Sequence, residues 1–319
     1  MNTKPIIIIA GEPYSIFSEI FFKSLLKYKL KKKLILIGSR KLFESQMKHF
    51  GYNFKFKQIP KKFESKQLLQ NYINIINVNF HYKKIFDKIS DKSNLYIKNS
   101  FDIALHIVKN HKISGLINGP ISKKHFLNKN FLGITEYLAK KTKTNKYAMI
   151  IYNKFLSVCP ITTHLPIKHV AEKISKKMIV EKIIVINKFY LKNFKKKPRI
   201  AITGLNPHCE SNHKFNEEIK IIKPSIKDLK KNGINVLGPY PADTIFLKKN
   251  RINFDIIVGM YHDQVLAPIK TIFEYNAINI TAGLPFIRIS PDHGPNEQMM
   301  GKNISNPNSL IEAIKFLDR

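Results

Sequence analysis

Short apolar runs alternate with amphipathic, lysine-faced segments along the 319-residue chain, and this alternation restricts the fold more than any other feature. The apolar run at 6–10 precedes a segment with helical apolar spacing at 15–29. The run at 34–39 precedes a second such segment, which Gly51 is expected to end. Strands that alternate with helices are typical of a parallel sheet, so the sequence predicts the α/β class.

The second half of the chain continues the same alternation. Helical spacing extends over residues 166–198, and Asn216 is expected to cap a helix that stops at Asn232 and Gly233. The sequence contains no internal repeat and no low-complexity linker. We therefore expect two interleaved α/β lobes, one formed by residues 1–140 and 280–319 and the other by residues 141–279.

The net charge of +33 raises the question of nucleic-acid binding. The positive charge comes from 50 lysines and only 5 arginines, and it is spread over the whole chain. Base and phosphate recognition favours arginine forks with aromatic platforms, and the sequence has no such patch. The composition therefore argues against a nucleic-acid partner, while a small anionic substrate agrees with the charge.

The apolar runs are the length of strands and far shorter than a membrane span, so no membrane partner is expected. The first residues are interpreted as a strand and not as a signal peptide. The two cysteines, Cys159 and Cys209, do not make a disulfide framework. A cytoplasmic enzyme is the expectation.

Three of the eleven histidines share one context, because each follows the carboxyl end of a strand-like run. They are His164 in TTH, His208 in NPH and His262 in MYHDQ. Ligands of open α/β sheets bind at that edge, and three imidazoles suit a catalytic metal with an open coordination position. The alternative is three ordinary turn histidines. Asp263 and Asp243 are candidates for partners of the histidines or for additional ligands.

The sequence lacks a Walker loop, a G-x-G-x-x-G turn and a nucleophile elbow. Cys209 is interpreted as a small side chain that fills a tight turn, and not as a nucleophile. Arg288 lies in an apolar segment of a chain in which arginine is rare, which indicates a need for its planar, bidentate group. Anion binding is assigned to Thr135, Lys270, Asn279 and Arg288.

Several motifs together resemble the 4-hydroxythreonine-4-phosphate dehydrogenase family of pyridoxine phosphate biosynthesis. They are TTHLPI (162–167), GLNPH (204–208), GPYPADTIF (238–246), MYHDQ (260–264), NIT (279–281) and GLPFIRISPDHG (283–294), with a weaker match at GEP (11–13). The resemblance implies an isocitrate/isopropylmalate-dehydrogenase-like fold, with the active site between two α/β lobes. It also implies a homodimer whose active sites contain residues of both subunits.

The resemblance also implies roles for individual residues. His164, His208 and His262 match divalent-metal ligands, of which the third is supplied by the partner subunit. Thr135, Lys270, Asn279 and Arg288 match substrate-binding positions, and Asp243 and Lys270 are the catalytic candidates. The implied metal is zinc, magnesium or cobalt, and the implied oxidant is NAD, with NADP left open.

The implied reaction oxidises the C3 hydroxyl of 4-phosphohydroxy-L-threonine, and the resulting β-keto acid loses carbon dioxide. The chain departs from the family at Ile134, where a histidine is usual, and in the turn after Gly11. It also departs in the segments that follow His208 and Gly294. These changes leave two alternatives open: a dehydrogenase for threonate or erythronate 4-phosphate, or a non-catalytic, basic binding remnant of the fold.

Overall fold

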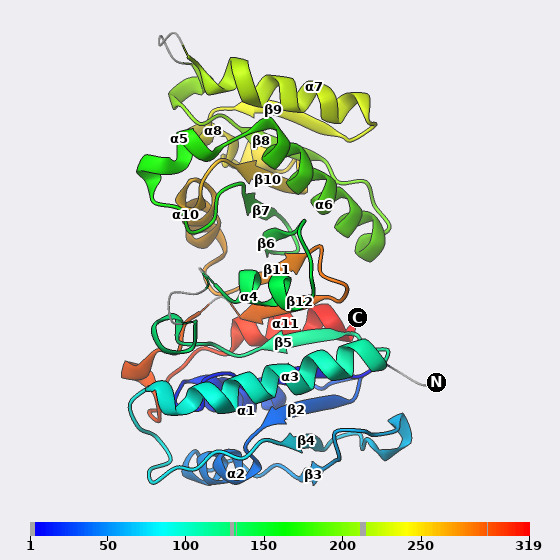
Figure 1. Cartoon of the computed structure of the whole chain (residues 1–319), viewed down its shortest axis with the longest axis vertical. Helices are drawn as coiled ribbons and strands as arrows, with labels where there is room; N and C mark the ends of the chain where they lie inside the picture. The colour runs from blue at the N-terminus through cyan, green and yellow to red at the C-terminus, as the bar shows by residue number, and fades with distance from the viewer. Residues whose placement is uncertain (1–3, 128–130, 132, 211–214, 292) are drawn as a thin grey trace. The chain divides into compact units, whose positions relative to one another are not determined.

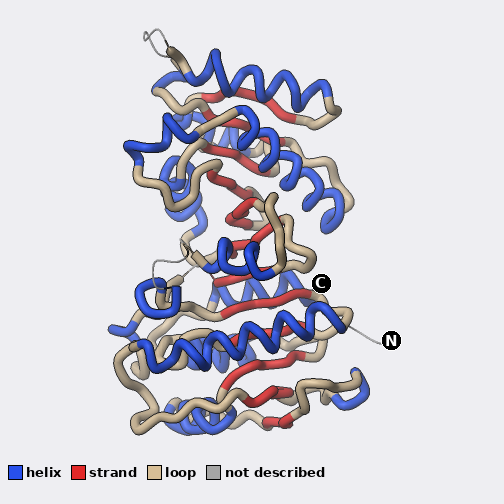
Figure 2. Tube along the Cα trace, viewed as in Figure 1, coloured by secondary structure: helices blue, strands red, loops and turns tan. Residues whose placement is uncertain are grey.

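The computed structural model describes residues 4–127, 131, 133–210, 215–291 and 293–319, and it divides into two compact units (Figure 1). The first unit is formed by Met1–Leu138 and Phe286–Arg319, and the second by Ala139–Pro285. In each unit, strands are layered with helices (Figure 2). The predicted α/β class is confirmed.

The sheet of the first unit has the order β3-β4-β2-β1-β5-β12, and all of its neighbouring strands are parallel. Its central strands are continuous apolar runs because helices cover both faces of a parallel sheet. All four residues of β1 are fully buried isoleucines. The strands are β1 (Ile6–Ile9), β2 (Leu34–Gly38), β3 (Phe56–Gln58), β4 (Ile73–Asn77), β5 (Gly115–Asn118) and β12 (Arg288–Pro291).

The helices of the first unit contact one another and both faces of this sheet. Helix α1 contacts α2 and α11, and α3, in front of the strands in Figure 1, contacts β1 and β2. Helix α2 stops where Gly51 adopts a left-handed φ of 74°, as predicted. The helices are α1 (Phe17–Lys27), α2 (Arg40–His49), η1 (Ser65–Gln67), η2 (Asp91–Ser93), α3 (Asn94–Asn110), η3 (Lys123–Leu127), η7 (Glu297–Met299) and α11 (Asn308–Asp318), together with α4 (Ile134–Lys141), whose last three residues belong to the second unit.

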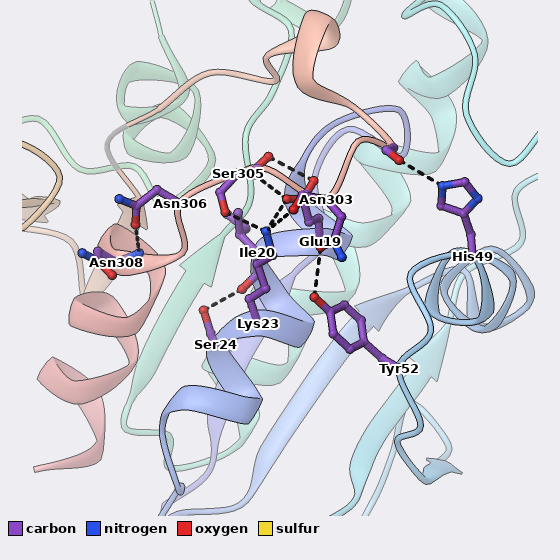
Figure 3. A network of polar contacts seen from close by, with 11 residues as sticks. Glu19, Ile20, Lys23, Ser24, His49, Tyr52, Asn303, Ser305, Asn306 and Asn308 are labelled. Carbon is purple, nitrogen blue, oxygen red and sulfur yellow. Dashed lines mark hydrogen bonds and ion pairs between the residues drawn. The ribbon is translucent and has the colours of Figure 1, made fainter.

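A buried carboxylate attaches α1 to the segment that precedes α11 (Figure 3). Glu19 is fully buried and accepts hydrogen bonds from the backbone N–H and the hydroxyl of Ser305. Lys23 lies 2.7 Å from Glu19 and donates to the carbonyl oxygens of Asn303 and Ser305. The ion pair and the surrounding donors compensate the desolvation of Glu19.

The sheet of the second unit has the order β11-β6-β7-β10-β8-β9. Strands β7, β10, β8 and β9 are mutually parallel, as the alternation of strands and helices favours. Strand β6 departs from this arrangement, because it is antiparallel to both β7 and β11. A tight turn joins β6 to β7, in which the Asn153 N–H donates to Leu156, and so short a connection cannot cross over to a parallel neighbour. The strands are β6 (Ala148–Tyr152), β7 (Ser157–Pro160), β8 (Ile200–Thr203), β9 (Val236–Tyr240), β10 (Ile256–Gly259) and β11 (Ile278–Ala282).

The helical stretch predicted at 166–198 is divided at Ser175, whose hydroxyl caps a new helix by accepting from the Met178 N–H. Asn216 accepts from the Ile219 N–H, which confirms the predicted cap. None of the helices in the described ranges combines the length and the apolar character that a membrane span requires. The helices of the second unit are η4 (Ile167–His169), α5 (Val170–Lys173), α6 (Lys176–Phe194), η5 (Pro207–Cys209), η6 (Glu218–Ile222), α7 (Lys223–Lys231), α8 (Ala242–Ile245), α9 (Lys248–Arg251) and α10 (His262–Phe273).

Candidate active site

The three predicted histidines follow three neighbouring parallel strands of the second unit (Figure 1). His164 follows β7, His262 follows β10 and His208 follows β8. The registers pair Gly259 with Pro160 and Val258 with Ile202, so the three strands end at one edge of the sheet. Sheet topology therefore brings together loops that are far apart in the sequence.

The structure brings His164 and His262 together. Their ring centroids lie 6.2 Å apart, and the ring planes are inclined by 35°. His262 is the first residue of α10, and its Nδ1 lies 2.7 Å from Oδ1 of Asp263. With the proton on Nδ1, that atom donates to Asp263 and leaves the Nε2 lone pair available as a ligand.

His208 lies in a strained turn beyond β8. It adopts a φ of 55°, Cys209 adopts a φ of 62°, and the His208 side chain is exposed. Among the residues that the structure describes, no three His, Cys, Asp or Glu side chains are grouped as ligands of one metal ion. Within this chain His262 is the histidine that lies beside His164. The implied division of the three histidines between two subunits stays a prediction.

Glu218 holds the loop before this turn, and no sequence pattern assigned it that role. It is fully buried, and its carboxylate accepts from the backbone N–H groups of Leu205 and Asn206 at 2.7 and 2.8 Å. The Asn206 side chain adds a third hydrogen bond at 2.9 Å. Burial alone would raise the pKa of Glu218, but these donors outweigh it and hold the pKa below its usual value.

Asp243 lies in the short helix α8 and is exposed. Burial raises the pKa of the Cys209 thiol, and the negative charges of Glu218 and Asp243 contribute further. Asp243 is thus near enough to act electrostatically on the turn that contains His208. The raised pKa agrees with the interpretation of Cys209 as a small turn residue and not as a thiolate nucleophile.

Two predicted anion-binding residues meet in the first unit. Arg288 in β12 is completely buried, and its guanidinium donates to Oδ1 of Asn118 at 2.7 Å and to Oγ1 of Thr135 at 3.4 Å. Burial lowers the pKa of Arg288 to about 9, although Glu136 opposes this effect. Asn118, at the end of β5, is a member of this group that the sequence did not reveal.

The other two anion-binding candidates lie in the second unit. Lys270 is exposed on α10, two turns after His262, and Asn279 is half-buried in β11. A further carboxyl group, Glu12 in the loop after β1, is buried and accepts from the Ser93 hydroxyl at 3.0 Å. Burial raises the pKa of Glu12 to about 7. The GEP motif (11–13) contains Glu12, but the sequence does not predict that this side chain is buried.

The chain matches the family model described as pyridoxal phosphate biosynthetic protein PdxA over residues 30–317. It is 38% identical to 4-hydroxythreonine-4-phosphate dehydrogenase of Sulfurihydrogenibium sp. (strain YO3AOP1) over 314 residues, which cover 97% of this chain and 96% of that protein. It is 31% identical to D-threonate 4-phosphate dehydrogenase of Salmonella typhimurium, with coverage of 99% and 98%.

The structure is similar to that of a putative 4-hydroxythreonine-4-phosphate dehydrogenase from Salmonella typhimurium, with a TM-score of 0.86. The two chains are 28% identical, and the match covers 99% of each.

Proposed function

Because the chain belongs to the PdxA family and is an oxidoreductase of the 4-hydroxythreonine-4-phosphate dehydrogenase type, we propose that it oxidises 4-phosphohydroxy-L-threonine at the C3 hydroxyl. NAD would supply the hydride acceptor in this proposal, and NADP remains the alternative oxidant. The β-keto acid that results loses carbon dioxide, in the biosynthesis of pyridoxal 5'-phosphate. The coarser assignment, a dehydrogenase of phosphorylated hydroxy acids, agrees with the names of the relatives.

The pairing of His164 with His262 is the observation that supports a metal-dependent reaction most strongly. One ion bound about 2 Å from a nitrogen of each ring would hold the centroids about 5 to 6 Å apart. The observed 6.2 Å is slightly longer than the tetrahedral value, so the rings are near enough for one ion to draw them together. A divalent metal (zinc, magnesium or cobalt) would act there as a Lewis acid that makes the C3 hydroxyl more acidic. His208 completes the proposed ligand set, with the three histidines divided between the two subunits of a homodimer.

The remaining candidates bind and orient the substrate. Arg288 and Thr135 offer a guanidinium and a hydroxyl to an anionic group, and burial strengthens such contacts. Lys270 and Asn279 are proposed to contact the phosphate or the carboxylate. Asp243 and Lys270 remain the proposed catalytic residues, and the negative charge of Asp243 acts on the turn that contains His208.

A dehydrogenase for D-threonate 4-phosphate is the second candidate function. Relatives at 31% and 32% identity carry that name, and Ile134 stands at the start of α4 where the family usually has a histidine. The higher identity, 38%, to a relative named 4-hydroxythreonine-4-phosphate dehydrogenase favours the first function.

A substrate comparison tests the proposal. NADH formation is followed with 4-phosphohydroxy-L-threonine and with D-threonate 4-phosphate, at equal concentrations of NAD and divalent metal. We expect a higher kcat/KM with the first substrate. A preference for the second would assign the alternative function, and absence of NADH with both would contradict the proposal.

A further inference from the structure

A buried glutamine joins two of the loops that carry the histidines. Gln264 lies in the first turn of α10, two residues after His262, and only 8% of its surface is exposed. Its Oε1 accepts from the Met260 N–H at 2.6 Å and from the Thr203 hydroxyl at 2.9 Å. Its Nε2 donates to the Gly204 carbonyl at 2.8 Å. One side chain thus connects the loop after β10 with the loop after β8.

The partners of the amide determine its orientation. The Met260 N–H can only donate and the Gly204 carbonyl can only accept, so a flipped amide would lose both hydrogen bonds. A glutamate at the same position could accept from Met260 and Thr203 but could not donate to Gly204. The network therefore requires a glutamine.

Two glycines at the ends of the strands make this close packing possible. A Cβ atom on Gly259 would lie 2.4 Å from Cγ1 of Val265 and 2.9 Å from Oε1 of Gln264. A Cβ atom on Gly204 would lie 2.7 Å from Sγ of Cys209. The backbone at both glycines is thus packed closely against side chains that follow His208 and His262 in the chain.

The third histidine loop joins the same peptide. Thr162, two residues before His164, donates its backbone N–H at 3.1 Å and its hydroxyl at 2.8 Å to the Met260 carbonyl. Met260 is itself fully buried. Its N–H is bonded to Gln264 and its carbonyl to Thr162, so one peptide segment connects all three loops.

We propose that Gln264 is a positioning residue of the histidine site, which fixes the loop before His208 to the start of α10 through Met260. This inference rests on the proposed function, because it explains how the proposed metal ligands are held in place. Groups hydrogen-bonded directly to metal ligands orient them, and their loss typically weakens metal binding about 10- to 100-fold. Gln264 acts one step farther away, on the backbone of the loops that carry His208 and His262. In a buried network, the loss of one member also leaves the other groups without their partners.

The decisive variant is Gln264→Met, which keeps the length and shape of the side chain but removes the amide. Cobalt chloride is titrated into the purified full-length protein by calorimetry. We expect the Kd for Co²⁺ to rise about 10-fold, the lower end of the range for direct partners of metal ligands, in Gln264→Met and in Gln264→Glu. Thr203→Ser, which keeps the hydroxyl, is expected to bind Co²⁺ like the wild type, whereas Thr203→Val is expected to bind it more weakly.

A control separates positioning from a general loss of stability. Ile257→Val removes one buried methyl group from β10 without touching the network, and it is expected to cost about 1 kcal/mol of folding free energy. This variant should keep the wild-type Kd for Co²⁺. If Gln264→Met is destabilised in the same way and also keeps the wild-type Kd, the proposal is overturned.

A second readout does not depend on the metal. Imidazole nitrogen resonances are recorded for the metal-free protein, with Asp263→Asn as the matched control beside His262. We expect Gln264→Met to shift the signals of both His208 and His262, and Asp263→Asn to shift those of His262 but not those of His208. If the wild type binds no Co²⁺, the metal part of the proposed function fails. Independently of that result, an unchanged His208 signal in Gln264→Met would reject the positioning role of Gln264.

Discussion

The imidazole rings of His164 and His262 lie 6.2 Å apart, although the two residues are distant in the sequence. They meet because β7 and β10 are parallel neighbours whose ends are in register at Pro160 and Gly259. The pairing is therefore a property of the sheet, which brings the two imidazoles together although no local sequence spacing does so. The Asp263 carboxylate holds one of the two rings, that of His262, through its Nδ1.

Removal of Asp263 should weaken metal binding. Asp263→Ala removes the acceptor that holds His262 Nδ1, so the ring loses its preferred tautomer and orientation. We expect the Kd for Co²⁺ to rise about 10-fold, toward the lower end of the usual range because Asp263 is exposed. Calorimetric titration measures this, with Asp228→Asn as the control, since Asp228 lies in α7 of the same unit and pairs with Lys176. Equal Kd values in all three proteins would contradict the assigned role.

Arg288 should control substrate affinity. Arg288→Lys keeps a positive charge but loses the planar fork that contacts Asn118 and Thr135. We expect the KM for the phosphorylated substrate to rise about 10-fold or more. Because a change at a fully buried position also affects folding, Thr135→Val and Thr135→Ser form the matched pair. Only the loss of the hydroxyl should raise KM, and an unchanged KM in Thr135→Val would count against the anion-binding role.

Glu218 should stabilise the folded protein most at neutral pH. Its pKa is lower in the folded state than in the unfolded chain, so its contribution is present above the ordinary value of 4.5 and is lost as the pH falls through the folded-state pKa. Glu218→Gln should reduce the free energy of unfolding by about 1–3 kcal/mol at pH 7. The difference in the free energy of unfolding between Glu218→Gln and the wild type, measured by urea titration, should become smaller as the pH falls below 4.5. A difference that is constant with pH would exclude this explanation.

Glu12 should produce the opposite pH dependence. Burial raises its pKa from the ordinary 4.5 to about 7, so the folded protein keeps a proton that the unfolded chain loses within that interval. The contribution of Glu12 to the free energy of unfolding is complete below pH 4.5. It declines by up to about 3 kcal/mol as the pH rises to 7. Glu12→Gln should lack this decline. Urea unfolding of the wild type and of Glu12→Gln is compared between pH 4.5 and 7. Free energies of unfolding that change in parallel with pH in the two proteins would be evidence against the raised pKa.

The sequence predicted the features that are local in the chain. The apolar runs marked the strands before His164, His208 and His262, because a parallel strand covered on both faces must be apolar throughout. The rarity of arginine singled out Arg288, which is indeed completely buried. Gly51 and Asn216 marked a helix end and a helix start because their preferences are properties of single residues.

Features that depend on the order of the strands in the sheet could not be predicted from the sequence. The contacts of Gln264 require β8 to lie beside β10, although these strands are far apart in the chain. The antiparallel direction of β6 follows from a short turn that resembles any other polar connection. The burial of Glu218 and its three hydrogen bonds likewise follow from tertiary packing, which local sequence patterns do not encode.

The most direct test of a metal-dependent oxidation at the histidine pair is a metal add-back assay. NADH formation from 4-phosphohydroxy-L-threonine and NAD is measured in protein treated with a chelator, before and after addition of a divalent metal. We predict no turnover without metal, recovery on its addition to the wild type, and no recovery in His262→Ala. Full turnover in His262→Ala with retained metal, or turnover in the wild type that the chelator does not affect, would contradict the account.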